Sequence, residues 1–382
     1  MTWVENGDIF CGMEKRYIQK QVEKDLKNKM VFVSGPRQVG KTTLAMSLLK
    51  TTESYLNWDL PTHREAILKR ELPLTDLWCF DEIHKYKSWR DYLKGVYDEF
   101  HKTHQILVTG SARLDLLRKS GDSLQGRYYH LRLHPLSMKE LGLTTQEEFL
   151  KLLALGGFPE PYFLDSELEA KRWSTNYRSL LVNQESSSIE IISDLSKLEL
   201  LSLRLPELVG FPLSLNALRE DLQIAHKTVS RWMDILENIY MIYRLSPFGS
   251  PLIRAVKKEQ KHYHYDWTLV QDMAARFENM IASHLLKWVH YQRDFFGEEM
   301  ELRYFRDTDG REVDFCLTKN LKPQMFVECK WKEGSTSGHL NYLKKKFPDV
   351  EHYQVAATGT EKYINKNSII HIPAIKFLQK FV

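Results

Sequence analysis

The sequence is poor in cysteine, because its 382 residues contain only four. They are scattered and include no C-x-x-C pair, which argues against a zinc site and against a disulfide framework. This pattern is typical of a protein in the reducing cytoplasm. The four are Cys11, Cys79, Cys316 and Cys329.

Long apolar runs are absent too. No run reaches the roughly 20 residues that a helix needs to span a bilayer. The amino terminus carries Glu5 and Asp8 where an export signal would have its apolar segment. We therefore expect a cytoplasmic protein that makes no use of a membrane. Internal repeats and low-complexity segments are also lacking.

The excess of positive charge is small, with 54 Lys and Arg against 50 Asp and Glu. A net charge of +4 permits binding to nucleic acid but does not require it. Hydrophobic residues make up 43% of the chain, which excludes a disordered protein. At about 150 residues per domain, the length predicts two or three domains.

The strongest motif follows an apolar run at residues 30–33, a predicted buried strand, and precedes a predicted helix at 43–49. It has the spacing Gly-x-x-x-x-Gly-Lys-Thr, which is the P-loop signature in its required setting. The two glycines let backbone N–H groups turn toward a phosphate. The predicted nucleotide contacts are Gly35, Pro36, Arg37, Gln38, Val39, Gly40, Lys41, Thr42 and Thr43.

Two residues of this loop have predicted chemical roles. Lys41 is a catalytic residue that reaches the β- and γ-phosphates, and the Thr42 hydroxyl is a ligand of Mg²⁺. The alternative is a Gly-rich turn with a surface lysine. The flanking strand and helix favour the P-loop, so the sequence predicts ATP and Mg²⁺ as cofactors.

A second motif, residues 77–84, places four apolar residues before an Asp-Glu pair. It is typical of a Walker B strand, in which Asp81 holds Mg²⁺ through its water shell and Glu82 polarises the attacking water. Two adjacent buried carboxylates are costly unless a cation or a water network satisfies them. The alternative is an acidic pair at a helix amino terminus.

A third buried strand is predicted at 105–113, and it ends in hydroxyl side chains. Thr109 and Ser111 are placed to hold the hydrolytic water or to sense the γ-phosphate. Arg113 is predicted to touch the γ-phosphate, and Arg127, at the start of the next strand, is a candidate arginine finger. For both arginines the alternative is a salt bridge at a strand edge.

The order of these motifs resembles a family of prokaryotic AAA-type ATPases. The resemblance rests on the P-loop, the Asp-Glu strand, the Thr-Gly-Ser-x-Arg strand, Gly126-Arg127 and the segment His134-Pro135-Leu136-Ser137. It covers residues 15–160 closely, and it extends to signal-transducing ATPases that pair a P-loop core with a winged helix. It implies a parallel-sheet P-loop NTPase core of the α/β class.

The family carries a Gly-Gly-x-Pro element, which stands here at residues 156–159. By resemblance to the signalling ATPases, Pro159 lines the adenine pocket. From the residues alone, the alternative is a turn at a domain boundary. We expect three domains: an ATPase domain at 1–155, a helical lid with a winged helix at 156–250, and a third domain at 251–382.

In the middle segment, helices are predicted at 164–193 and 198–209, and a helix-turn-helix at 213–236 is followed by a strand at 239–245. This is the layout of a winged helix. Its second helix exposes His226, Lys227, Ser230 and Arg231. That helix either reads DNA or belongs to a lid that relays nucleotide state, and nearby acidic residues favour the lid.

The carboxy-terminal segment has strands predicted at 264–267, 302–306, 310–317 and 325–331, and a helix at 275–286. Glu328 and Lys330 are two apart on one strand, so they share a face that Asp314 meets from the paired strand. Asp314 and Glu328 are predicted catalytic metal ligands, Lys330 orients the nucleophile, and Glu278 completes the site. The alternative is a solvated ion pair on a hairpin.

This set resembles the Asp…Glu-x-Lys core of restriction-endonuclease-like nucleases, although Val313 stands where that core usually has proline. The AAA-type family often carries such a carboxy-terminal domain, without an assigned function. We predict a Mg²⁺-dependent ATPase whose cycle controls a nuclease-like module that interacts with DNA. The alternative is an ATP-controlled regulatory switch or DNA-binding protein without nuclease activity. A homo-oligomer is expected if an arginine finger acts on a neighbouring copy.

Overall fold

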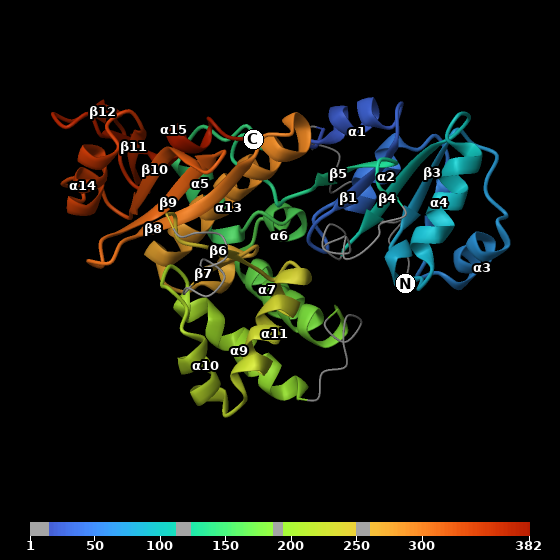
Figure 1. The fold of residues 1–382 in the computed structure, drawn as a ribbon, viewed down its shortest axis with the longest axis horizontal. Helices are drawn as coiled ribbons and strands as arrows, with labels where there is room; N and C mark the ends of the chain where they lie inside the picture. Colours follow the sequence, from blue (N-terminus) through green and yellow to red (C-terminus); the bar gives the residue numbers. More distant parts are fainter. Residues whose placement is uncertain (1–14, 112–123, 186–193, 250–259) are drawn as a thin grey trace. The chain divides into compact units, whose positions relative to one another are not determined.

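The computed structural model describes residues 15–111, 124–185, 194–249 and 260–382 (Figure 1). The chain divides into two compact units, Met1–Pro135 and Leu136–Val382. No helix among the described residues is both long and apolar enough to cross a membrane. Arg113 lies outside the described residues.

The first unit is built on a five-stranded sheet with the order β2-β3-β4-β1-β5, in which all neighbours are parallel. Segments that follow the strands therefore meet at one edge of the sheet. The elements of this unit are α1 (Gln19–Asp25), β1 (Met30–Ser34), α2 (Lys41–Leu48), β2 (Tyr55–Asn57), α3 (Pro61–Lys69), β3 (Leu77–Asp81), α4 (Trp89–Phe100), β4 (Gln105–Gly110) and β5 (Tyr128–Arg132).

The central strands of this unit are buried on both faces. All five residues of β1 are buried, which explains why its sequence is a continuous apolar run rather than an alternating one. Trp89, Leu93 and Val96 of α4 pack against Phe32 and Phe80 of the sheet. This core fixes the carboxyl ends of β1 and β3, where the predicted P-loop begins and the Asp81–Glu82 pair lies.

The second unit starts with helices and a small hairpin. Its helices are α5 (Gln146–Leu155), α6 (Pro159–Leu164), α7 (Glu167–Leu180), α9 (Leu195–Arg204), α10 (Leu215–Leu222) and α11 (His226–Asn238). A π-helix at Leu181–Glu185 extends α7. Strands β6 (Ile242–Leu245) and β7 (Lys261–His264) then form an antiparallel pair.

The rest of this unit is a six-stranded mixed sheet with the order β12-β13-β11-β10-β9-β8. Long helix α13 packs against β8, β9 and β10, and α14 packs on β9. The elements are α13 (Met273–Phe296), β8 (Met300–Arg306), β9 (Glu312–Lys319), β10 (Lys322–Lys330), α14 (Gly338–Lys346), β11 (Glu351–Ala356), β12 (Tyr363–Ile364), β13 (Ile370–Pro373) and α15 (Ala374–Leu378).

The helix predicted from residue 164 begins later, at Glu167. Asp165 has a left-handed φ of +54°, and the Ser166 side chain accepts a hydrogen bond from the Glu169 N–H, so one helix ends and another is capped there.

The strand predicted at 264–267 lies at Lys261–His264 instead. The Asp266 side chain accepts from the Thr268 N–H at 3.1 Å and turns the chain after that strand.

The compact units divide the chain after Pro135, whereas the sequence places the end of the ATPase domain at residue 155. Helix α5 belongs to the second unit because it packs against other elements of that unit. The ring centroids of Phe149 and Phe277 lie 6.1 Å apart, and the Trp267 indole N–H donates to the Leu152 carbonyl. The segments predicted as separate middle and carboxy-terminal domains lie together in this unit.

Candidate nucleotide-binding site and acidic cluster

The predicted P-loop is the turn between β1 and α2, and close backbone contacts fix its path. A β-carbon at position 35 would come within 2.2 Å of the Leu133 carbonyl oxygen, so only glycine fits there. Gly40 has φ = +98°, a conformation that glycine adopts readily, and it leads into α2. The first N–H groups of α2 have no acceptor within the helix, as an anion site requires.

Lys41 turns back into this loop. Its side chain is buried, and its ammonium donates to the Gly35 carbonyl at 2.9 Å and to the Pro36 carbonyl at 2.7 Å. The positive charge therefore lies inside the predicted phosphate cradle. A phosphate in the loop would offer this ammonium a stronger, charged acceptor than either carbonyl.

An arginine outside the motif braces the loop. Arg16, which is buried, donates to the Val39 carbonyl and to the His134 carbonyl, each at 2.6 Å. It thereby ties the P-loop to the segment that follows β5. The sequence analysis did not identify Arg16, because no local pattern shows that a residue before β1 contacts the chain so far downstream.

Asp81 ends β3 and is also buried. The Tyr55 hydroxyl donates to one of its carboxylate oxygens, and the Thr109 hydroxyl donates to the other. Burial, followed by the neighbouring charge of Glu82, raises the pKa of Asp81. Thr109 therefore orients the Asp81 carboxylate. The sequence predicted instead that Thr109 holds the hydrolytic water or senses the γ-phosphate.

Glu82 adopts a left-handed conformation with φ = +54°. Its carboxylate accepts from the Ser111 N–H at 2.9 Å and from the Ser111 hydroxyl at 3.0 Å, and the Lys85 ammonium lies 3.9 Å away. The predicted water-activating carboxylate is therefore held by the loop that follows β4. Ser111 therefore positions the Glu82 carboxylate, whereas the sequence predicted that Ser111 holds the hydrolytic water or senses the γ-phosphate.

The residues at this edge fit Mg²⁺ by their chemistry. Thr42 and Asp81 offer oxygen ligands, which Mg²⁺ prefers, and nucleotide sites usually supply only one or two protein ligands besides phosphate and water. Among residues 15–111, 124–185, 194–249 and 260–382, no three His, Cys, Asp or Glu side chains converge as a preformed metal site. A site that the nucleotide itself completes does not require such a group.

Arg127 does not lie at this edge. The Met30 N–H donates to the Arg127 carbonyl, which places Arg127 at the amino end of the parallel strands, across the sheet from the P-loop. Its guanidinium also pairs with Asp98 at 2.8 Å. The length of β1 therefore separates Arg127 from the phosphate cradle of its own chain, and its role as an arginine finger stays a prediction.

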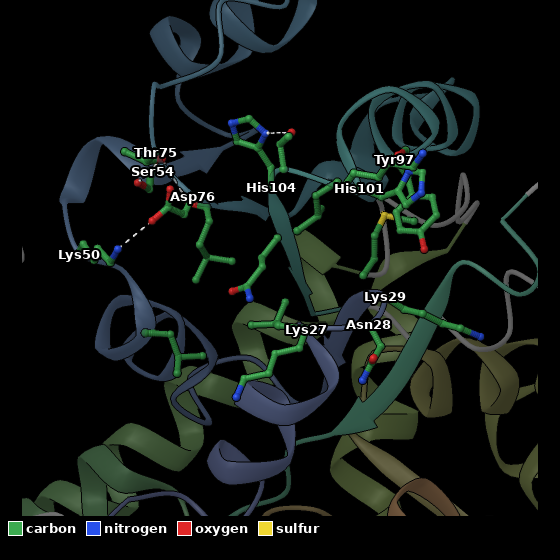
Figure 2. Close-up of a pocket in the computed structure, with 18 residues that line it drawn as sticks. Lys27, Asn28, Lys29, Lys50, Ser54, Thr75, Asp76, Tyr97, His101 and His104 are labelled. Atoms are coloured by element: carbon green, nitrogen blue, oxygen red, sulfur yellow. Dashed lines mark hydrogen bonds and ion pairs between the residues drawn. The ribbon is translucent and has the colours of Figure 1, made fainter.

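A cavity of about 410 Å³ opens at the amino ends of β1, β3 and β4 (Figure 2). Met30, Leu77 and Gln105 line it, and the Lys50 ammonium pairs with Asp76 at 2.7 Å beside it. This edge lies opposite the P-loop, so the cavity is not the nucleotide site. Its basic lining consists of Lys27, Lys29, Lys50, His101, Lys102 and His104.

Two further predicted sites lie in the second unit. Pro159 is the buried first residue of α6, and its contact with adenine stays a prediction. On α11, His226, Lys227 and Arg231 are exposed, as the sequence predicted, whereas Ser230 is half-buried. The preceding helix ends at Gln223 in a left-handed conformation, which gives a short turn between α10 and α11.

The residues of the Asp…Glu-x-Lys pattern come together on β9 and β10. The Lys330 ammonium donates to Glu328 at 2.7 Å, and Asp314 accepts from the Cys329 N–H at 2.7 Å. Val327 pairs with Phe315, which puts Glu328 beside Asp314. The alternation of a strand predicted this juxtaposition correctly.

A lysine that the sequence analysis did not identify lies in the same cluster. Lys261 of β7 is only 1% exposed, and its ammonium lies 2.7 Å from Glu312, 3.6 Å from Glu278 and 3.9 Å from Asp314. The Tyr263 hydroxyl, from the same strand, donates to Glu278 at 2.7 Å. No local signal could have placed β7 here, since it is remote in sequence from β9.

The pKa values of the cluster reflect burial among like charges. Burial, and then the charge of Asp314, raises the pKa of Glu278 and of Glu328 well above the ordinary range. Burial also raises the pKa of Asp314. Burial by itself lowers the pKa of Lys261, because it disfavours the charged form. The surrounding carboxylates together outweigh burial and raise this pKa, so the lysine stays protonated.

These residues do not fit the divalent ion that the sequence predicts. The Lys261 ammonium already lies within 4 Å of Glu278 and Asp314, two of the three predicted ligands. The third, Glu328, is paired with Lys330. Within the described part of the chain, no group of three carboxylate, imidazole or thiol side chains is arranged around an open centre.

Comparison with known families divides the chain into three parts. Residues 27–142 match an AAA domain, residues 146–279 match a domain of unknown function (DUF8612), and residues 274–375 match another domain of unknown function (DUF4143). The chain therefore carries an AAA-type P-loop ATPase domain, as the motif order predicts. The winged helix and the nuclease-like fold stay predictions.

Relatives extend along most of the chain at low identity. An uncharacterized protein of Mycobacterium tuberculosis is 21% identical over 91% of this chain and 81% of its own length. One from Haemophilus influenzae is 22% identical over 80% and 83%. Among solved structures, the Walker-type ATPase of Pyrococcus abyssi (14% identity, 70% of this chain and 99% of that one) gives a TM-score of 0.40. The Aeropyrum pernix ORC1 protein in complex with DNA (13%, 69% and 91%) gives 0.35.

Proposed function

We propose that the AAA-type domain binds ATP at Gly35–Thr43 and hydrolyses it with Mg²⁺. The observation that carries this proposal is the buried ammonium of Lys41, held by two carbonyls inside a loop that only glycine can form at position 35. The Asp81–Glu82 pair lies at the same edge of the parallel sheet, at the carboxyl end of β3, which β4 separates from β1.

Each residue has a distinct role in this proposal. Lys41 exchanges its carbonyl partners for phosphate oxygens, and Glu82, positioned by Ser111, accepts hydrogen bonds from the attacking water. Thr42 and Asp81 would hold Mg²⁺, directly or through water. The ion would supply charge neutralisation for the triphosphate. Arg113 stays a proposed contact of the γ-phosphate within its own chain, and Arg127 stays a proposed arginine finger toward a neighbouring copy.

Two substitutions test this function. The Lys41→Ala protein should not bind ATP in calorimetry with Mg²⁺, because it lacks the cation of the cradle. The Glu82→Gln protein should bind ATP as the wild type does and turn it over at least about a hundredfold more slowly. Unchanged ATP binding by the first variant refutes the P-loop site, and unchanged turnover by the second removes Glu82 from its role.

The second part of the proposal concerns the carboxy-terminal residues. We propose that nucleotide state controls a nuclease-like domain that interacts with DNA. The order α13-β8-β9-β10-α14-β11, with Asp314 and the Glu328–Lys330 pair on the central strands, supports the likeness to restriction endonucleases. The exposed basic residues of α11, in a helix-turn-helix followed by the β6–β7 pair, support a winged helix.

The alternative is a switch or DNA-binding protein that does not cut. The position of Lys261 favours it, because an ammonium among the carboxylates disfavours a metal-dependent nuclease. Plasmid DNA incubated with ATP and Mg²⁺ or Mn²⁺ distinguishes the two. Cleavage that Asp314→Ala abolishes establishes the nuclease, whereas intact DNA, or cleavage that this substitution leaves unchanged, supports the alternative.

A further inference from the structure

The acidic cluster of the second unit contains its own cation. Three carboxylates, those of Glu278 on α13 and of Glu312 and Asp314 on β9, lie within 4 Å of the Lys261 ammonium. Glu312 and Asp314 lie on a strand that is far from β7 in the sequence, and Glu278 lies on the long helix that follows β7. Because all three carboxylates lie within 4 Å of the ammonium, Lys261 is a member of the cluster.

Lys261 is also firmly held in this position. Its ammonium lies over the Tyr304 ring, 5.5 Å from the ring centroid. Its strand β7 is hydrogen-bonded to β6, and the Leu213 N–H donates to the carbonyl of the preceding Gln260 at 2.9 Å. Only 1% of the side chain is exposed, so the charge cannot turn to solvent without movement of the strand.

We propose that Lys261 is the resident cation of the cluster formed by Glu278, Glu312 and Asp314, and that it keeps divalent metal ions out. A metal ion bound to Asp314 and Glu278 would lie a few Å from this ammonium, and two cations so close in a buried site repel strongly. The lysine also supplies the compensation that buried carboxylates require. The cluster is therefore complete without a metal.

This inference goes beyond the ATPase function and does not rest on it. It concerns metal binding by residues that are remote in sequence from the P-loop, and it is tested without nucleotide. If it holds, the carboxy-terminal domain keeps the architecture of a nuclease but acts by binding rather than by metal-assisted hydrolysis.

The test is the binding of Mn²⁺ by the full-length protein in the absence of nucleotide. Electron paramagnetic resonance measures this binding. Wild type and Asp314→Asn should take up the same amount of Mn²⁺, because the cluster holds none. Lys261→Met should gain a site that binds Mn²⁺ at least about tenfold more tightly than any site of the wild type. The double substitution with Asp314→Asn should lose that gain.

A matched control is Lys287→Met. Lys287 is also a buried lysine of the second unit, and its ammonium pairs with Glu140 at 2.6 Å. Because Glu140 is not one of the residues of the cluster, this variant should gain no Mn²⁺ site. Mn²⁺ binding to the wild type that Asp314→Asn abolishes would overturn the proposal. So would a folded Lys261→Met protein with no gain. If Lys261→Met does not fold, the comparison of wild type with Asp314→Asn still decides.

Discussion

At the scale of single residues, the nucleotide site depends on backbone contacts that leave almost no room for larger side chains. Gly35 lies against Leu133, and Arg16 ties the carbonyls of Val39 and His134 together. These contacts give the P-loop its shape before any nucleotide arrives. Preorganisation of this kind lowers the cost of binding, so its loss should appear in ATP affinity.

The Gly35→Ala protein should bind ATP at least about tenfold more weakly, a loss of roughly 1.4 kcal/mol. Its β-carbon would meet the Leu133 carbonyl oxygen at 2.2 Å, so the loop must move. Gly334→Ala is the matched control, since a β-carbon there meets nothing within 4 Å. Isothermal titration with ATP and Mg²⁺ measures both, and equal affinities would contradict the close contact.

Arg16→Ala should weaken ATP binding and also lower the midpoint of thermal unfolding. The substitution removes two charged hydrogen bonds to buried carbonyls, and each such bond is worth about 1.5–3 kcal/mol. Arg16→Lys, which keeps the charge but cannot reach both carbonyls in the same way, should fall between the alanine variant and wild type. A wild-type affinity in Arg16→Ala would show that the brace does not shape the loop.

Sequence reasoning found the residues whose neighbours are set by local periodicity. Glu328 and Lys330 share a face because strands alternate, and the spacing of Gly35 to Thr42 between a predicted strand and a predicted helix indicates a P-loop. It missed Arg16 and Lys261, whose partners lie on segments distant in sequence. Only the packed fold decides which remote strand supplies a counter-charge.

At the scale of elements, α13 anchors the start of the second unit. The Met138 N–H donates to Nε2 of His284 at 3.1 Å, while Nδ1 of the same ring bonds the Met280 carbonyl at 2.8 Å. The Lys287 ammonium contacts Ser137 at 3.0 Å. These contacts explain why residues from 136 onward pack with the later helices, although sequence pattern joins them to the ATPase core.

This anchor predicts a pH dependence. The Met138 bond requires neutral His284, and burial lowers the pKa of this histidine from 6.5 to about 4; Lys287 also lowers it, and Glu140 opposes the shift. The unfolded chain takes up a proton near pH 6.5, so stability is full above that pH and falls as the pH drops toward 4. At pH 5 the loss from this group is about 2 kcal/mol.

This effect is measured by comparing the unfolding midpoints of wild type and His284→Gln between pH 7.5 and 5. That interval is roughly the range in which histidine titrates. The variant should be less stable at pH 7.5 but should lose less on acidification. Burial also lowers the pKa of His262 and of His352, so part of the acid sensitivity should remain in the variant. An identical pH profile for the two proteins would exclude His284 as a source.

Element types were easier to predict than element limits. The buried strands of both sheets follow from apolar runs, and helix α13 follows from Phe277, Ile281 and Leu285, all of which are buried. The division between α6 and α7 depends on the conformation of Asp165 and the capping bond of Ser166. Such short-range geometry carries little signal in hydrophobic periodicity.

At the scale of the whole molecule, the proposed function joins an ATPase domain to a DNA-interacting domain in one chain, and it requires that the states of the two be coupled. Coupling has a strict thermodynamic form: if ATP changes the affinity for DNA by some factor, DNA must change the affinity for ATP by the same factor. The proposed function therefore makes a quantitative statement about two binding constants, independent of how the units move.

We expect the Glu82→Gln protein, which holds ATP without hydrolysis, to bind DNA with an affinity about fivefold or more different from that of its nucleotide-free form. Fluorescence anisotropy with labelled duplex measures this factor, and calorimetry with ATP in the presence and absence of DNA measures its counterpart. The two factors should agree. The Lys41→Ala protein should show no dependence of DNA affinity on nucleotide, because it cannot take up ATP.

Substitutions in the second unit then locate the DNA contact. Arg231→Ala should weaken DNA binding if α11 lies on the DNA, whereas Lys330→Ala tests the face of β10. Both side chains are exposed, although Lys330→Ala also removes the partner of the buried Glu328. A loss confined to Arg231→Ala assigns DNA binding to the helix-turn-helix segment, because phosphate contacts contribute much of such affinity. If neither variant alters DNA affinity and ATP leaves it unchanged, ATP does not control DNA binding through these surfaces, and the switch acts on another partner.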